Sequence, residues 1–306
     1  MEKIAFLFPG QGAQYVGMGR DFYDNFTAAK DVFVEVDDLL HFNLSEVIFN
    51  GPLDLLSKTL YSQLGIFVNS VALLKVLKQE MNLIPDLCAG LSLGEYTALF
   101  ACGYIDFKDN LFLIQKRAEL MHEACKRCPG TMAAILGLED SKVEDVLKNV
   151  KNVFCANYNC PYQIVISGSK EGIEEAMQLL KQNGAKCVLL KVEGAFHSPL
   201  MSCVKNELEE EINKVKLKDA SIPLVMNVSG NVAASLQDIR CNLINQLNCS
   251  VRWKQSIEKM IELDVFSFLE IGCGRSLSSM NKKIGVKGAI FSLEKVEDLE
   301  KLKNIT

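Results

Sequence analysis

The chain has few of the residues that interrupt or disorder a fold. Only 7 of its 306 residues are proline, and no segment is of low complexity. Hydrophobic residues make up 49% of the sequence, enough to bury one large core or two smaller ones. This composition excludes a disordered chain, and we expect a folded, globular protein.

The chain also lacks an excess of positive charge. It has 33 Lys and Arg residues against 38 Asp and Glu residues, a net charge of -5, with both signs mixed along its length. Nucleic-acid binding requires clustered positive charge, so small molecules or proteins are the expected partners. The first residues, MEKIAFLFPGQG, fit neither a signal peptide nor a spanning helix. We therefore expect a cytoplasmic protein without a membrane partner. We also expect it to be a monomer.

Cysteine is present but gives no disulfide pattern. The 11 cysteines are an odd number and lie mostly in apolar segments, which is typical of buried thiols in a reducing compartment. Cys125 and Cys128 form a C-x-x-C pair with His122 nearby. A structural zinc site needs four ligands, however, and no second pair has matching spacing. We expect neither a metal nor a cofactor.

Apolar runs alternate with helical patterns along the chain. Residues 4–8 and 87–89 resemble short buried parallel strands, and residues 63–78 and 96–102 have helical spacing. Later segments read as helix (199–215) and strands (223–228 and 265–270). The alternation predicts an α/β fold with a large α/β hydrolase-like domain and a mostly parallel sheet.

A different pattern begins near residue 131. It reads strand, helix, strand, strand, helix, strand over residues 132–136, 140–150, 153–157, 163–167, 171–182 and 187–192. This βαββαβ order is that of a ferredoxin-like unit. We expect residues 129–193 to form a small inserted domain, and residues 1–128 and 194–306 to form the large, discontinuous catalytic domain.

A possible nucleophile lies in Gly90-Leu91-Ser92-Leu93-Gly94. This G-x-S-x-G motif stands between a predicted strand and a predicted helix, the context of a strained turn that exposes a serine hydroxyl. A glycine-rich turn could contain the same pentapeptide by chance, but the flanking elements favour catalysis. The amide of Leu93, at the start of the helix, would point toward an oxyanion at Ser92.

A catalytic serine needs a base, and the chain has only 3 histidines. His41 and His122 lie in predicted helices. His197 lies in the turn-like segment GAFHSP, at the expected domain junction. A lone loop histidine is often structural, yet elimination of the other two favours His197 as the base.

Arg117 is the most informative charged residue. A helical projection of residues 111–121 places it among apolar side chains, so its guanidinium faces inward. Burying that charge is costly unless it meets an anion. An internal Asp or Glu would satisfy it, and so would a substrate carboxylate held by the two-pronged guanidinium.

Glycines near the N-terminus suggest a nucleotide site at first sight. Gly10-Gln11-Gly12 begins a G-x-G-x-x-G pattern, but its third glycine would fall on Tyr15. The dinucleotide-binding interpretation therefore fails on spacing.

Five stretches carry a family resemblance that covers nearly the whole chain. They are FPGQGAQYVGMG (8–19), GLSLGEYTALFACG (90–103), QKRAELM (115–121), GAFHSPLM (194–201) and NQLNCSVRW (245–253). In this order they resemble the malonyl-CoA:acyl carrier protein transacylases and the acyltransferase domains of fatty-acid and polyketide synthases.

The resemblance implies a role for each matching residue. It makes Ser92 the nucleophile, His197 the base and Arg117 the group that binds the malonyl carboxylate. The backbone amides of Gln11 and Leu93 would bind the oxyanion, and the backbone carbonyl of Gln246 would orient the histidine. Two further positions would line the acyl site: Phe196, which resembles malonyl-selective members, and Met121. Leu91 departs from the pattern, because many relatives carry histidine there.

The implied activity is transfer of a malonyl group from malonyl-CoA to the phosphopantetheine thiol of acyl carrier protein, through a malonyl-serine, for fatty-acid synthesis. Three alternatives remain open: a serine thioesterase or esterase, an acyltransferase that serves a polyketide synthase, and a non-catalytic scaffold in which Arg117 is paired internally. Carrier proteins are acidic, so basic surface residues are candidate contacts: Lys214, Lys216, Lys218, Lys282 and Lys283.

Overall fold

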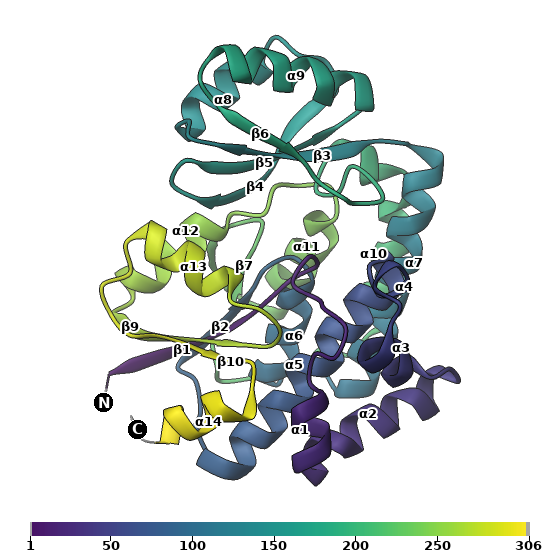
Figure 1. Cartoon of the computed structure of the whole chain (residues 1–306), viewed down its shortest axis with the longest axis vertical. Coiled ribbons are helices and arrows are strands. Elements are labelled where there is room, and N and C mark those ends of the chain that lie inside the picture. The colour runs from purple at the N-terminus through teal and green to yellow at the C-terminus, as the bar shows by residue number, and fades with distance from the viewer. Residues whose placement is uncertain (1, 304–306) are drawn as a thin grey trace. The chain divides into compact units, whose positions relative to one another are not determined.

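The computed structural model describes residues 2–303 (Figure 1). Its internal contacts divide the chain into two units. The first unit contains the described residues up to Gln115, Leu217–Val225 and the described residues from Met260 onward. The second unit contains Lys116–Lys216 and Met226–Lys259. Each unit is built around its own sheet.

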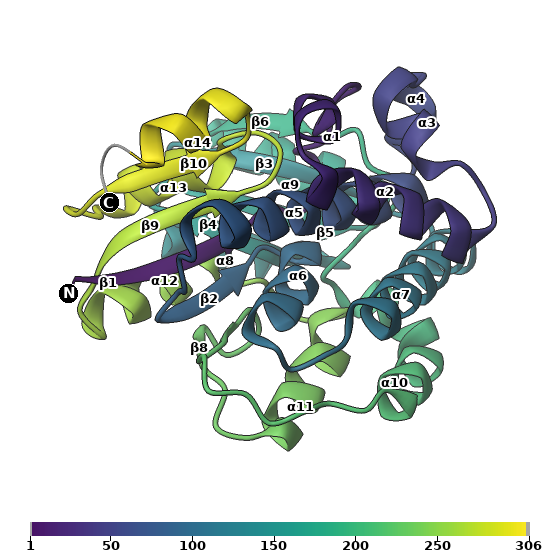
Figure 2. The ribbon, with the colours of Figure 1, turned by 90° about the horizontal axis from the view of Figure 1, so that it is seen from below.

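A parallel sheet of four strands forms the centre of the first unit. The strands are β1 (Lys3–Phe8), β2 (Leu87–Gly90), β9 (Val265–Ile271) and β10 (Ile290–Leu293), in the order β10-β9-β1-β2. Each neighbouring pair is parallel, as Figure 2 shows. β1 is central, and Ala5–Phe8 are fully buried because layers cover both faces of such a sheet. The strands predicted at 4–8, 87–89 and 265–270 are confirmed, whereas β10 was not predicted.

Helices flank this sheet and continue into an N-terminal helical layer. α1, α2 and α3 pack against α5, and α6 packs against β1 and β2 (Figure 2). Within residues 2–303, α5 is the helix long and apolar enough to cross a membrane, and 78% of its most apolar window is buried in the protein. The first unit's helices are α1 (Arg20–Asn25), α2 (Thr27–Leu40), α3 (Leu44–Asn50), α4 (Leu53–Leu56), α5 (Thr59–Met81), α6 (Leu93–Cys102), α13 (Ser276–Ile284) and α14 (Val296–Lys303).

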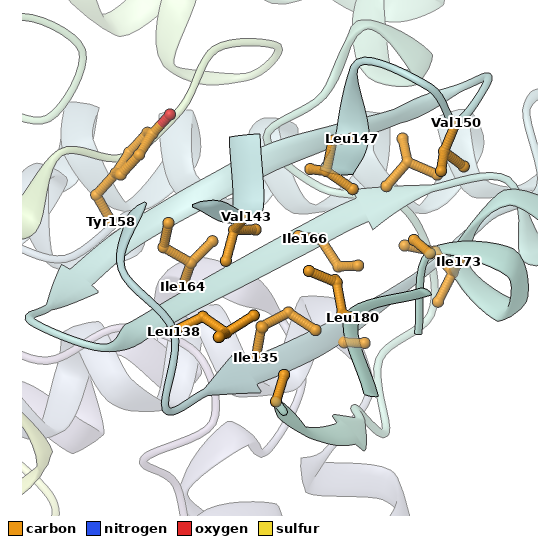
Figure 3. Close-up of a cluster of buried hydrophobic side chains, with 14 residues drawn as sticks. Ile135, Leu138, Val143, Leu147, Val150, Tyr158, Ile164, Ile166, Ile173 and Leu180 are labelled. Carbon is orange, nitrogen blue, oxygen red and sulfur yellow. The ribbon is translucent and has the colours of Figure 1, made fainter. Parts of the chain in front are cut away.

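The second unit contains an antiparallel sheet of four strands in the order β4-β5-β3-β6. Its elements are β3 (Thr131–Leu136), α8 (Asp140–Leu147), β4 (Val153–Cys160), β5 (Gln163–Gly168), α9 (Lys170–Gln182) and β6 (Lys186–Leu189). The predicted βαββαβ order is therefore observed. Strand residues Ile135, Ile164 and Ile166 pack with Leu147 and Leu180 from the two helices in one buried cluster (Figure 3).

The remaining elements differ in detail from the sequence prediction. They are α7 (Phe107–Arg127), η1 (Pro199–Val204), α10 (Lys205–Lys214), β7 (Val225–Met226), β8 (Asn231–Val232), α11 (Leu236–Gln246) and α12 (Trp253–Glu262). The single helix predicted over 199–215 is two helices, because the backbone at Val204 (φ -123°, ψ 12°) leaves helical geometry. The strand predicted over 223–228 is only two residues long, since a turn closed by Gly230 N to Met226 O follows it.

Candidate active site

Ser92 lies in a sharp turn between β2 and α6. It is the N-cap of α6, with φ 53° and ψ -103°, a backbone conformation that non-glycine residues rarely adopt. Such strain is characteristic of a nucleophile turn that lifts the serine hydroxyl off the end of a strand. The predicted sequence of strand, turn and helix around Ser92 is thus confirmed.

Three glycines allow the turn to pack tightly against the chain that leaves β1. A Cβ atom at Gly90 would lie 1.9 Å from the Gly94 backbone, and one at Gly94 would lie 2.0 Å from the carbonyl oxygen of Phe8. One at Gly10 would lie 2.3 Å from the carbonyl oxygen of Leu91. Only glycine fits at these contacts. Gly10 therefore touches Leu91, and the residues that follow them are Gln11 and Ser92.

The same turn provides a backbone donor. Leu93 is the first residue of α6, so no group within the helix can accept its amide hydrogen. Gln11 follows β1, and its side-chain oxygen accepts a hydrogen bond from Nε2 of Gln63 at 3.5 Å. Gln63 lies on α5 and is fully buried. Sequence analysis missed it, although a glutamine in a mostly apolar, buried helix was the available signal.

His197 belongs to the second unit and is held by a main-chain acceptor. Its Nδ1 lies 2.8 Å from the backbone carbonyl oxygen of Gln246. A carbonyl can only accept, so Nδ1 carries the proton and Nε2 keeps its lone pair. This tautomer, with the proton on Nδ1, is the one that a general base requires, because Nε2 can then accept a proton. His197 also has a positive φ of 55°, and its side chain is buried.

Burial and a nearby cation keep the imidazole neutral. Desolvation by burial, and to a smaller extent the positive charge of Arg117, lower the pKa of His197 to about 4, although the hydrogen bond to Gln246 acts in the opposite direction. His197 is therefore uncharged at neutral pH. A neutral imidazole can accept a proton, whereas an imidazolium cannot.

Arg117 faces inward, as the helical projection predicts. It lies on α7 with only 1% of its surface exposed. Its Nη2 donates to the side-chain oxygen Oε1 of Gln246 at 2.9 Å. This partner is a neutral amide, which orients the guanidinium without adding negative charge.

Gln246, at the end of α11, joins the histidine and the arginine. Its backbone carbonyl contacts His197, its Oε1 contacts Arg117, and its Nε2 donates to Oδ1 of Asn227 at 3.4 Å. Gln246 and Asn227 are both fully buried. Sequence analysis missed Asn227, because it lies in an irregular segment with no motif.

The two acyl-site candidates also belong to the second unit. Met121 lies one turn after Arg117 on α7 and is buried, as is Phe196, the residue before His197. A cavity of about 340 Å³ has His197 and Arg252 in its wall.

Cys125 belongs to the C-x-x-C pair noted in the sequence. Its thiol donates a hydrogen bond to the carbonyl oxygen of Met121 at 3.0 Å.

Comparisons with known proteins identify the family to which the chain belongs. The family described as acyl transferase domain matches residues 5–285. The chain belongs to the acyl transferase family. It is 43% identical to the malonyl CoA-acyl carrier protein transacylase of Bacillus subtilis (strain 168), over 98% of this chain and 96% of that protein.

Solved structures of the acyl transferase family resemble the whole chain. The crystal structure of malonyl CoA-acyl carrier protein transacylase from Clostridium perfringens superposes with a TM-score of 0.93 at 37% identity, covering 99% of this chain and 96% of that one. A type II PKS acyl-carrier protein in complex with its malonyl-transacylase gives a TM-score of 0.96 at 33% identity, covering 99% and 100%. The α/β architecture of these structures is that of the present chain.

Proposed function

We infer that the chain is a malonyl-CoA:acyl carrier protein S-malonyltransferase that supplies fatty-acid synthesis. The observation that carries this function is the 43% identity, over 98% of the chain, to a malonyl CoA-acyl carrier protein transacylase. The neutral, correctly protonated imidazole of His197 and the buried guanidinium of Arg117 support it. The substrates are malonyl-CoA and the phosphopantetheine thiol of acyl carrier protein.

In the proposed first half-reaction, Ser92 attacks the malonyl thioester. Its Oγ bonds to the carbonyl carbon while Nε2 of His197 takes the hydroxyl proton, and the amides of Gln11 and Leu93 donate to the oxyanion. The C–S bond then breaks, and the coenzyme A sulfur leaves with the proton from His197. The product is a malonyl-serine ester.

In the second half-reaction, the carrier-protein thiol replaces coenzyme A. Arg117 holds the malonyl carboxylate through charge-assisted hydrogen bonds while the ester waits. His197 removes the proton of the incoming thiol, sulfur attacks the ester carbonyl, and the serine oxygen leaves and regains the proton. Two half-reactions through one covalent intermediate give ping-pong kinetics.

Service to a polyketide synthase is the second candidate function. The specific observation in its favour is the TM-score of 0.96 to a malonyl-transacylase solved with a type II PKS acyl-carrier protein. The chemistry on Ser92 would be the same, and only the acceptor carrier protein would differ. Competition between the two kinds of carrier protein for the malonyl-enzyme distinguishes these functions.

We also propose how the fold is divided. Residues 129–193 would form the inserted ferredoxin-like domain, supported by their own sheet and buried cluster. Residues 1–128 and 194–306 would form the α/β hydrolase-like domain, of which residues 1 and 304–306 lie outside the described part. We also propose that the protein is a cytoplasmic monomer.

The proposed contact with an acidic carrier protein uses exposed lysines. Lys216, Lys282 and Lys283 are exposed. Lys214 pairs with Glu211 at 2.9 Å, and Lys218 pairs with Asp106 at 2.6 Å, so nearby carboxylates partly compensate their charge. Lys282→Glu should therefore weaken carrier-protein binding more than Lys214→Glu.

A two-stage kinetic assay tests the proposed function. Mixing enzyme with malonyl-CoA alone should release one burst of coenzyme A per active site and then stop. Adding holo acyl carrier protein should restart release and produce malonyl-carrier protein. Sustained coenzyme A release without carrier protein would indicate a thioesterase, and no burst would indicate a non-catalytic protein.

A further inference from the structure

Gln246 presents a neutral oxygen to a buried cation. Its Oε1 accepts from Nη2 of Arg117 at 2.9 Å, and both side chains are almost completely inaccessible. A carboxylate in this position would form an ion pair with the guanidinium and compete with an anionic substrate. An amide oxygen fixes the direction of the guanidinium and leaves its charge for the substrate carboxylate.

An amide can, however, turn around. Its oxygen and its NH₂ group have nearly the same size, and the hydrogen-bond partners decide which one points where. If the amide of Gln246 were reversed, an NH₂ group would face the N–H groups of Arg117. Two donors would then oppose each other in a buried site, and the guanidinium would lose its support.

Asn227 supplies the partner that decides this orientation. Its Oδ1 lies 3.4 Å from Nε2 of Gln246, on the side of the amide away from Arg117. Asn227 is fully buried, and its own carbonyl oxygen accepts from the amide of Arg252 at 2.8 Å. This backbone bond holds Asn227 in place independently of its side chain.

We propose that Asn227 is a positioning residue for the malonyl carboxylate. Its Oδ1 accepts a hydrogen bond from Nε2 of Gln246, and this bond turns Oε1 of Gln246 toward Arg117. The guanidinium of Arg117 is thereby held in one direction, and Gln246 adds no negative charge that would compensate its positive charge. The inference rests on the proposed function, because it assigns Arg117 to a substrate carboxylate. His197 should keep its orientation, since its Nδ1 bonds to the backbone carbonyl of Gln246, which the side-chain amide does not set.

Asn227→Leu tests the proposal, because leucine has a similar size and cannot accept a hydrogen bond. We expect the ratio of kcat/KM for malonyl-CoA to that for acetyl-CoA to fall about tenfold, as for a lost bond in a charged network, mainly through a higher KM for malonyl-CoA. Acetyl-CoA has no carboxylate, so its KM should change little. An unchanged ratio, or an equal loss for both substrates, would overturn the proposal.

Asn242→Leu is the matched control. Asn242 is also a buried asparagine and lies one turn before Gln246 on α11, but its side chain bonds to Asp238. Its replacement should lower thermal stability without changing the malonyl-to-acetyl ratio. A fall in the ratio as large as that of Asn227→Leu would mean that general disturbance of α11 is responsible, and the proposal would be wrong.

Two further variants decide the matter if Asn227→Leu does not fold. Asn227→Asp keeps an acceptor for Nε2 of Gln246 and should retain most of the malonyl preference. Gln246→Glu places a carboxylate beside Arg117, and this variant should lose the malonyl preference. Equal losses in both variants would overturn the proposal.

Wild-type enzyme and Arg117→Ala separate this inference from the proposed function. If wild type does not transfer malonyl groups, the proposed function fails. If wild type does so and Arg117→Ala loses the malonyl preference while Asn227→Leu keeps it, only the role of Asn227 fails.

Discussion

His197 Nδ1 lies 2.8 Å from the backbone carbonyl oxygen of Gln246, so a main-chain group stands where many serine enzymes place a carboxylate. The carbonyl fixes the tautomer but adds no negative charge. Burial and the positive charge of Arg117 therefore lower the pKa of His197. The proposed base is neutral over a wide pH range as a result.

This relationship predicts the acid limit of the reaction. Because the pKa of His197 is lowered to about 4, the imidazole stays in its basic form as pH falls through the ordinary histidine range near 6.5. The rate of Ser92 acylation should remain close to its neutral value at pH 5 and fall as pH approaches 4. Rapid-quench measurement of acylation against pH checks this. A loss of half the rate near pH 6.5 would contradict it.

Arg117→Ala should change the choice of acyl group. Removing the guanidinium takes away charge-assisted bonds to the malonyl carboxylate, worth about 1.5–3 kcal/mol, so kcat/KM for malonyl-CoA should fall roughly tenfold or more. Use of acetyl-CoA should be spared or raised. Parallel assays with the two substrates measure the effect, and Arg117→Lys serves as a charge-conserving control. An unchanged malonyl preference in Arg117→Ala would rule out the carboxylate-binding role.

Gly94→Ala should disable the nucleophile turn. The added Cβ would lie 2.0 Å from the carbonyl oxygen of Phe8, and backbone must move to relieve that contact. We expect a large loss of acylation together with a lower melting temperature. Gly137→Ala is the control: it has φ 92° with open space around it, so it should cost about 1–2 kcal/mol of stability and spare activity. Full activity of Gly94→Ala would show that the turn is not constrained in this way.

Phe196→Ser tests the acyl pocket. Phe196 is buried and directly precedes His197, so a smaller side chain there should admit an acyl group with a substituent at the α-carbon. One methyl group in a pocket is worth only about 1–3 kcal/mol, so the discrimination against methylmalonyl-CoA should fall roughly tenfold. Competition between malonyl-CoA and methylmalonyl-CoA measures it. If discrimination stays at the wild-type level, Phe196 does not shape the pocket.

Local patterns in the sequence predicted the features that depend on neighbouring residues. Three such features are the buried strand at residues 4–8, the strand, turn and helix around Ser92, and the inward orientation of Arg117. Each depends on the pattern of apolar and polar residues over one short segment. The division of residues 199–214 into two helices was missed, because it depends on a backbone departure at Val204 that no periodicity announces.

Contacts between distant residues could not be predicted in the same way. Arg117 and Gln246 are 129 positions apart in the sequence, and their hydrogen bond exists only because α7 and α11 meet in the fold. The bond from Gln63 to Gln11 spans 52 positions. Family resemblance identified the backbone role of Gln246, but its side-chain contacts and Asn227 required the structure.

Mass spectrometry of the intact protein after mixing with malonyl-CoA tests the central claim most directly. Wild-type enzyme should gain the mass of one malonyl group, and peptide mapping should locate it on Ser92. The adduct should be absent from Ser92→Ala and should disappear from wild type when holo acyl carrier protein is added. A wild-type protein that gains no malonyl group, or carries it on another residue, would contradict the account.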